Sequence, residues 1–91
     1  MESSVPQSND NRPPRAELDA WFRDEVQPHE LELRRFLRGF APPADIDDLV
    51  QETYLRLLRA REKRPLFHLR ALMLAIGRNA ALDLFRRRSA V

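Results

Sequence analysis

The chain has 91 residues, which is enough for one small domain and too few for two. Apolar residues make up 43% of it, charged residues 33%, and only two residues are glycine. This composition favours helices over a closed barrel or a β-sandwich, which need frequent turns. Because cysteine is absent, the sequence excludes a disulfide framework and a thiolate metal site, so packing or a partner must hold the fold together.

The two signs of charge are separated along the chain. Residues 1–53 contain 6 Lys or Arg against 12 Asp or Glu, a net charge of −6, whereas residues 54–91 contain 10 against 2, a net charge of +8. This split predicts two partners, a polyanion for the basic half and a different partner for the acidic half. A solvated surface with accidental polarity is the alternative at this point.

The first residues carry no targeting or membrane signal. No stretch approaches the roughly 18 apolar residues of a membrane span, and the polar start Met1-Glu2-Ser3-Ser4 does not resemble a signal peptide, so we expect a cytoplasmic protein. Residues 1–14 are rich in Ser, Asn, Gln and Pro, and too few of them are apolar to repay the entropy of ordering. We therefore expect a flexible tail over 1–14 and a folded domain over 15–91.

Apolar residues recur at helical spacing from Arg15 onward, and Pro28 interrupts the pattern. The positions before the proline are Leu18, Trp21, Phe22 and Val26, and those after it are Leu33, Phe36, Leu37 and Phe40. This pattern predicts a helix, a break or kink, and a second helix that ends at the prolines of residues 41–44, because the residue before a proline avoids helical backbone angles.

Two further helices complete the expected fold. The first should begin with Asp45 as its cap and run to about Arg61, with carboxylates in the first turn, where the helix dipole favours them. Lys63-Arg64-Pro65 predicts a loop, and a long last helix should span about His68 to Arg88. The sequence therefore predicts an all-α domain of three or four helices.

The helix expected over residues 45–61 has two distinct faces. One is an ordinary core stripe formed by Ile46, Leu49, Val50, Thr53, Tyr54 and Leu57. On the opposite face the apolar Leu55 is surrounded by Asp48, Gln51, Glu52 and Arg59, with Leu58 and Tyr54 at the edge. An apolar residue ringed by polar groups is typical of a small protein-docking face, although single exposed leucines are also common.

The last helix is apolar nearly all round, which predicts a central position in the domain. Long cationic side chains suit phosphate, and aromatic rings can stack on unpaired bases. Residues of these kinds gather around the preceding loop, namely Arg61, Lys63, Arg64, Phe67, His68 and Arg70. Phe67 could instead fill the core. Further along, Arg78 is free to reach a partner, whereas Asn79, Asp83 and Arg86 can share one strip with an Asp–Arg pair.

Two segments resemble region 2 of bacterial extracytoplasmic-function (ECF) sigma factors. They are the string DDLVQETYLRLLR over residues 47–59 and the string RALMLAIGRNAALD over residues 70–83, followed by an arginine cluster, and the similarity covers roughly residues 17–88. The resemblance implies a helical domain that docks on the clamp helices of the RNA polymerase β′ subunit. It also implies that the domain recognises the minus-ten promoter element as the DNA opens.

The resemblance assigns roles to particular residues. Those implied for polymerase binding are Asp48, Gln51, Glu52, Leu55 and Leu58. Those implied for promoter DNA, chiefly a single strand, are Arg61, Lys63, Arg64, Phe67, His68, Arg70, Ala75, Arg78 and Asn79. The arginines would hold phosphates while a base that has left the duplex is captured. An anti-sigma factor is a further expected partner, and no cofactor or metal is expected.

The sequence departs from the family pattern in three places. Leu72 stands where many relatives carry Trp or Tyr, which predicts weaker melting of the duplex, and Gly77 replaces a more usual alanine. The chain also ends at Val91, before the region 4 that ordinarily follows, so the sequence is expected to be either an excised domain or a protein with region 2 alone.

Other classes of function fit the sequence less well. An enzyme is not expected, because His29 and His68 are far apart and no glycine-rich phosphate loop or nucleophile motif is present; neither is a small-molecule substrate or a membrane partner. A protein-interaction module without DNA binding, such as a clamp-binding decoy or an anti-sigma target, remains the principal alternative. An independent duplex-DNA binder would need a recognition helix that the sequence does not show.

Overall fold

The computed structural model describes residues 15–90, and the tail expected over residues 1–14 lies outside the described residues. The described chain is all-α, as the sequence predicts, and contains no strand. Its main helices are α1 (Arg15–Trp21), α2 (Glu30–Arg38), α3 (Ile46–Lys63) and α4 (Leu69–Ser89). Among the helices of this described part, none is long and apolar enough to cross a membrane.

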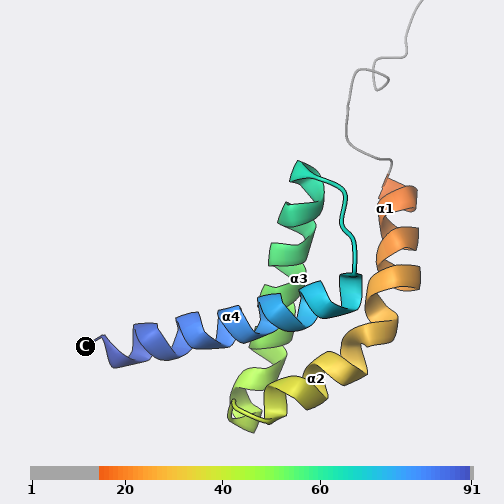
Figure 1. The fold of residues 1–91 in the computed structure, drawn as a ribbon. Helices are drawn as coiled ribbons and strands as arrows, with labels where there is room; N and C mark the ends of the chain where they lie inside the picture. Colours follow the sequence, from red (N-terminus) through yellow and green to blue (C-terminus); the bar gives the residue numbers. More distant parts are fainter. Residues whose placement is uncertain (1–14, 91) are drawn as a thin grey trace, which may run out of the picture.

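Helices α1 and α2 are joined by a bend in a continuous helical path (Figure 1), and the expected Pro28 lies in this bend. Proline has no N–H and its ring crowds the carbonyl four residues earlier, so an α-helix cannot continue through Pro28. The backbone widens into the π-helical turn η2 (Phe22–Val26), in which the Gln27 N–H donates to the Phe22 carbonyl. It then tightens into the 3-10 turn η3 (Gln27–His29), and the predicted kink is confirmed.

The turn between α2 and α3 corrects one expectation about Asp45. After α2 the chain passes through the 3-10 turn η4 (Pro43–Asp45), and Asp45 occupies the position before α3 but makes no capping hydrogen bond. Its buried carboxylate instead accepts two hydrogen bonds of 2.8 Å from the Arg88 guanidinium at the far end of α4. A bidentate, charge-assisted pair is stronger than a bond to a backbone N–H, so the cap is not formed.

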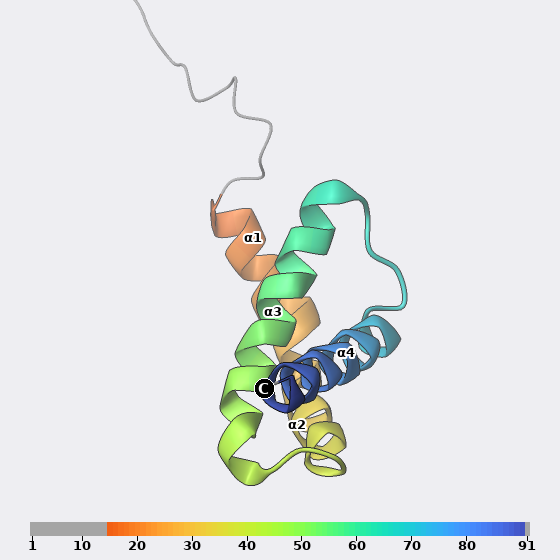
Figure 2. The ribbon, with the colours of Figure 1, turned by 90° about the vertical axis from the view of Figure 1, so that its left-hand side faces the viewer.

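Helix α4 crosses both α2 and α3 and packs against each of them (Figures 1 and 2). Its buried positions are Met73, Gly77, Ala80 and Ala81, three of which are small. Gly77 lies where the three helices approach one another closely, because a Cβ atom there would come within 2.9 Å of Leu33 Cδ1 on α2 and 3.3 Å of Thr53 Oγ1 on α3. The expected central place of the last helix is confirmed, and the absence of a side chain at Gly77 permits it.

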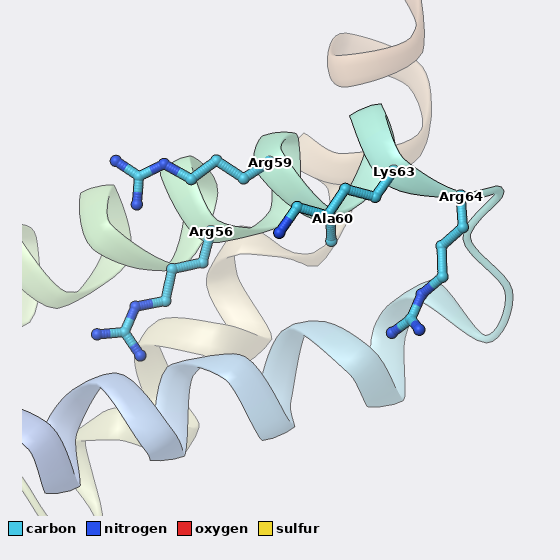
Figure 3. Close-up of a pocket in the computed structure, with 5 residues that line it drawn as sticks. All are labelled: Arg56, Arg59, Ala60, Lys63 and Arg64. Atoms are coloured by element: carbon cyan, nitrogen blue, oxygen red, sulfur yellow. The ribbon is translucent and has the colours of Figure 1, made fainter.

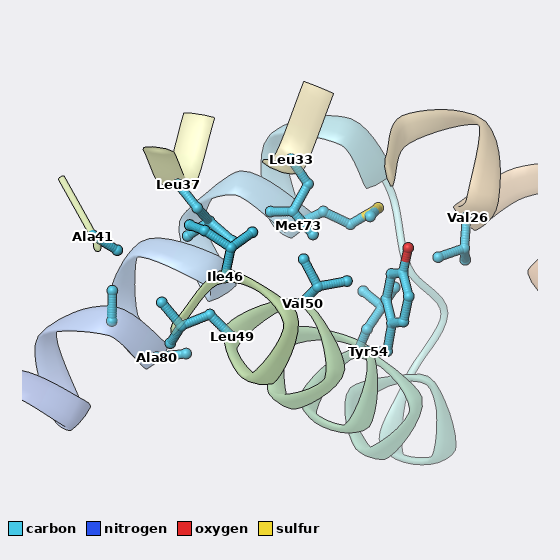
Figure 4. Close-up of a cluster of buried hydrophobic side chains, with 12 residues drawn as sticks. Val26, Leu33, Leu37, Ala41, Ile46, Leu49, Val50, Tyr54, Met73 and Ala80 are labelled. Carbon is cyan, nitrogen blue, oxygen red and sulfur yellow. The ribbon is translucent and has the colours of Figure 1, made fainter. Parts of the chain in front are cut away.

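The core is built from side chains of α2, α3 and α4, with Val26 of η2 at one end (Figure 4). Beside this core, a cluster of polar side chains links α2 to α3 by hydrogen bonds. The Tyr54 hydroxyl donates to Glu30 Oε1 at 2.6 Å, and Arg34 donates to both Glu30 (3.0 Å) and Asp47 (2.6 Å). The Tyr54 ring also meets the edge of Phe22 with centroids 4.9 Å apart. These contacts fix the orientation of α3, on which the candidate site lies.

Candidate functional site

The two faces predicted for α3 are both present. The buried residues of this helix are the six of the predicted core stripe, from Ile46 to Leu57. On the other side Leu55 is 48% exposed, and Asp48 and Gln51 are also exposed. A leucine this open on a helix whose other face is fully packed is available for contact with a partner.

The two carboxylates of this outer face differ in whether they already have an ion-pair partner. Glu52 accepts a hydrogen bond of 2.9 Å from Arg56, which in turn donates to Asp83 of α4 at 3.0 Å. Asp48 has no ion pair within residues 15–90. A partner cation therefore meets an unpaired charge at Asp48, whereas at Glu52 it must compete with Arg56. The expected Asp83–Arg86 contact is present but longer, at 3.5 Å.

Leu58, the remaining predicted polymerase contact, is half-buried in a shallow groove of about 420 Å³ between the α1–η2 segment and α3. The other residues that line the groove are Leu18, Asp19, Phe22, Arg23 and Gln27. Leu58 thus lies in the wall of a groove beside Leu55. The pattern of one helix could not reveal the groove, because its other wall comes from a segment some 35 residues earlier in the chain.

The loop before α4 presents an aromatic ring to solvent. Phe67 is 74% exposed, so the alternative in which it fills the core is wrong; Leu66 packs partly against the core instead. The next residue, His68, has a left-handed backbone with φ of 53° and leads directly into α4. This conformation is uncommon for a residue other than glycine, and it turns the chain into the helix while Phe67 stays outside.

The cations expected on the promoter side fall into two groups. The Arg61 guanidinium lies 4.5 Å from the centre of the Trp21 ring, and Arg70 makes two hydrogen bonds to Glu32. The hydrogen bonds from Arg70 hold the pKa of Glu32 below its ordinary value. Lys63, Arg64 and Arg78 are exposed and make no ion pair within the described residues. Those three retain the charge that a polyanion needs.

The exposed side of α4 brings together the remaining predicted residues. Ala75, Arg78 and Asn79 are exposed and lie three and four residues apart, which places them on one face, away from the buried Met73 and Gly77. Ala71 is exposed one turn earlier on the same side. The small alanine side chains and the polar side chains of Arg78 and Asn79 thus share this exposed face.

Helix α3 carries opposite charges on its two halves. Among residues 15–90 there is no group of three or more His, Cys, Asp or Glu side chains that could hold a metal ion. Acidic residues lie on the first half of α3, and exposed cations lie on its second half and on the loop that follows. The helix thus offers one surface to a basic partner and another to an anion.

Comparison with known proteins gives one match. The family model described as sigma-70 region 2 matches residues 26–91, which is well over half of the chain. No curated protein and no solved structure matched the chain. The matched segment begins at Val26 and includes α2, α3, the loop and α4, and therefore all the residues that the sequence predicted to bind polymerase or DNA.

Proposed function

Because the chain belongs to the sigma-70 region 2 family, whose members are domains of transcription initiation factors, we propose that it is region 2 of an ECF sigma factor. In this proposal it binds the clamp helices of the polymerase β′ subunit, recognises the minus-ten promoter element as a separated strand, and acts in the cytoplasm. The observation that carries the proposal is the outer face of α3, where an exposed Leu55 and the unpaired Asp48 share one side of the helix two turns apart.

Polymerase binding is supported by the composition of that face. An apolar residue supplies the contact that excludes water, and carboxylate and amide groups around it give charge complementarity to a basic helix. Leu55 would be the centre, Asp48 and Gln51 the polar rim, and Leu58 with its groove a second apolar contact. Glu52 would contribute less than Asp48 to polymerase affinity, because its carboxylate already accepts a hydrogen bond from Arg56.

We expect Asp48→Arg to weaken binding to core RNA polymerase about fivefold, because it replaces attraction at the rim by repulsion, worth about 1 kcal/mol. The measurement is a titration of core enzyme with the labelled chain. Glu17→Arg is the matched control, since it changes an exposed acidic residue of α1 by the same charge and should leave the affinity unchanged. Equal affinities for wild type and Asp48→Arg would reject this face.

Promoter binding is supported by the exposed Phe67 and by the cations that have no partner in the described part of the chain. Stacking of one base on an aromatic ring is worth about 1–3 kcal/mol, and each phosphate contact adds a salt-dependent increment. Arg61 and Arg70 would take part only after leaving Trp21 and Glu32. Lys63, Arg64 and Arg78 are therefore the stronger candidates for direct phosphate contact.

We expect Arg78→Glu to weaken strand binding about fivefold and to leave polymerase binding unchanged. The probe is a fluorescent single strand selected from a randomised pool by the wild-type chain bound to core polymerase. Arg35→Glu, the same charge reversal at an exposed arginine of α2, should leave strand binding unchanged. Loss of both activities in Arg78→Glu would indicate misfolding and would contradict a specific role for this residue.

One observation favours a second candidate function. Two of the cations expected to bind DNA already contact other side chains of the domain, Arg61 the Trp21 ring and Arg70 the Glu32 carboxylate, and Leu72 is half-buried where an aromatic wedge is expected. A clamp-binding module without promoter contacts would have these features. If the randomised pool yields no bound strand while the polymerase titration is positive, that second function is the correct one.

A further inference from the structure

Helix α2 carries a second surface with an exposed leucine. Leu31 is 64% exposed, and the exposed Arg35 and Arg38 follow it four and seven residues later. At this spacing the three side chains share one face of the helix, on the side away from the buried Leu33 and Leu37. Neither arginine makes an ion pair within residues 15–90. We call Leu31, Arg35 and Arg38 the basic strip.

The basic strip is complementary in charge to the outer face of α3. There the exposed leucine is Leu55, and the charge that has no partner in the described chain is the carboxylate of Asp48. Each of the two helices therefore presents one leucine together with unpaired charge of a single sign, positive on α2 and negative on α3. A surface of one kind attracts a surface of the other, and the two leucines can exclude water between them.

The basic strip and the outer face of α3 lie side by side. Arg34, the residue before Arg35, donates to the carboxylate of Asp47, the residue before Asp48, at 2.6 Å. Helix α4 packs against both α2 and α3 and covers their buried sides (Figure 2). The two exposed surfaces therefore share the side of the α2–α3 pair that α4 leaves open.

Two adjacent surfaces of opposite charge make this side of the molecule complementary to itself. If a second copy is turned by 180° about an axis that runs between the two surfaces, its basic strip lies over the outer face of the first copy's α3. The reverse contact forms at the same time, so the pair closes after two subunits, as in most small oligomers. Such a dimer brings Arg35 and Arg38 to Asp48 twice and covers two copies each of Leu31 and Leu55.

The second half of α3 limits where the basic strip of another copy can bind. The exposed Arg59, Lys63 and Arg64 lie there on a groove of about 370 Å³ (Figure 3), without an ion-pair partner in the part of the chain that the structure describes. A basic strip placed over these cations would be repelled. It is attracted only to the first half, where Asp48 is unpaired and the side chain of Asp47 remains 85% exposed.

We propose that the chain forms a weak two-fold dimer in which the basic strip of each copy binds the outer face of α3 of the other. Because few apolar side chains take part, we expect a small transient interface with a Kd of about 10 to 100 µM. Formation of the dimer does not depend on the proposed function, but its consequence does. If the outer face of α3 binds polymerase, dimer formation covers Leu55 and Asp48, and only the monomer binds core enzyme.

Sedimentation velocity of the full chain, at concentrations from well below to well above this Kd, measures the equilibrium between monomer and dimer. Reversing one rim charge weakens a contact about fivefold, and each contact occurs twice in a two-fold dimer. We therefore expect Arg35→Glu and Asp48→Arg each to raise the Kd about 25-fold. Leu31→Gln, which removes an apolar contact twice, should raise it about tenfold.

A mixture of the Arg35→Glu and Asp48→Arg chains tests the two-fold arrangement directly. In a mixed pair one contact joins the two reversed charges and the other joins the two native charges, so both contacts are attractive. We expect the equimolar mixture to dimerise with a Kd within about threefold of wild type. The single chain that carries both substitutions should recover in the same way. A mixture that dimerises no better than either variant alone would overturn the proposal.

Arg15→Glu is the matched control, because it reverses an exposed arginine of α1 outside both surfaces and should leave the Kd unchanged. Circular dichroism at low concentration should show wild-type helix content for every variant, because the substituted side chains are exposed. A dimer that persists unchanged in Arg35→Glu but is lost in Phe67→Ser would place the contact on the loop before α4 and would also overturn the proposal.

Binding to core polymerase, measured far below the dimer Kd, distinguishes failure of the dimer from failure of the proposed function. Both chains are then monomers, and Arg35→Glu should bind polymerase as tightly as wild type. Weaker binding by Arg35→Glu, with wild type monomeric at every concentration, would assign the basic strip to polymerase and reject the dimer. If wild type dimerises as described but does not bind polymerase, the dimer stands and the proposed function is rejected. If it binds polymerase but never dimerises, only the dimer is rejected.

Discussion

Replacing Gly77 by leucine is expected to lower the free energy of unfolding by about 3 kcal/mol, a large part of the stability of a domain this small. The Cβ atom alone would lie 2.9 Å from Leu33 Cδ1 and 3.3 Å from Thr53 Oγ1, and three more carbons would have to fit beyond it. Leu33 and Thr53 are both fully buried, so neither can move aside without disturbing α2 or α3.

The alanine variant separates this clash from the effect of glycine on the helix itself. Gly77→Ala gains about 1 kcal/mol of helix propensity but brings its Cβ into contact with the end of the Leu33 side chain. We expect the two effects to offset each other within about 1 kcal/mol. If the free energy of unfolding is much lower for Gly77→Leu than for Gly77→Ala, the difference reports how little space there is where α4 crosses α2 and α3.

Urea unfolding followed by circular dichroism measures both variants. Ala71→Leu, at an exposed position of the same helix, is the control and should change stability by less than about 0.5 kcal/mol. Leu33→Ala combined with Gly77→Leu should recover part of the loss, because it opens space at the point of contact. If Gly77→Leu were as stable as wild type, the close approach of α4 to α2 and α3 would be wrong.

The faces of α3 could be predicted from the sequence because they depend on one helix. A period of 3.6 residues decides which side chains share a side, and a stripe of six apolar or small polar residues can only be the packed one. All six of those residues are buried, and Leu55 is exposed as the same reasoning requires. Pro28 was equally informative, since its effect on the backbone is local.

The ion pairs could not be predicted, because their partners are far apart in the chain. Asp45 and Arg88 are separated by 43 residues, Glu32 and Arg70 by 38, and Arg56 and Asp83 by 27. The local sequence preference for aspartate before a helix predicts Asp45 as a cap. This prediction fails because the fold brings the Arg88 guanidinium to the same carboxylate. The pairing of Arg70 with Glu32 was hidden for the same reason, and the role of Arg70 in DNA binding stays a prediction.

The loop before α4 shows a different limit. Leu66 and Phe67 are adjacent and both apolar, and outside a helix no period decides which of them faces the core. The left-handed backbone at His68 sets the direction in which the chain enters α4, and histidine gives little sequence signal for it. The exposure of Phe67 therefore came from the structure, while its role in base stacking stays a prediction.

The second large effect is expected at the contact between Tyr54 and Glu30. Tyr54→Phe should lower the free energy of unfolding by about 1.5 kcal/mol at pH 7, the value typical of a hydrogen bond to a charged group. The ring itself stays, with its edge contact to Phe22, so the loss reports the hydroxyl and its bond of 2.6 Å. Because the side chain of Glu30 is 35% exposed, water can replace part of that bond, and a larger loss is not expected.

The loss at Tyr54 should depend on pH with a definite sign. The hydrogen bonds from Tyr54 and then Arg34 hold the pKa of Glu30 below its ordinary value of 4.5. A carboxyl group whose pKa is lowered by folding contributes stability above its ordinary pKa, and this contribution is lost as the pH falls through the folded value. Burial, with the bond to Glu30, raises the pKa of Tyr54, so its hydroxyl remains a donor throughout this range.

The difference in stability between wild type and Tyr54→Phe should therefore be largest at pH 7 and should narrow as the pH is lowered toward 3. Glu32 and Asp45 also have lowered pKa values, but they titrate in both proteins and cancel in the difference. Urea unfolding at pH 7, 5, 4 and 3 measures this difference in the free energy of unfolding. In a Glu30→Gln background, Tyr54→Phe should lower the free energy of unfolding by less than it does in the wild-type background. A difference that stays constant with pH would mean that Tyr54 stabilises the domain through its packing and not through the charge of Glu30.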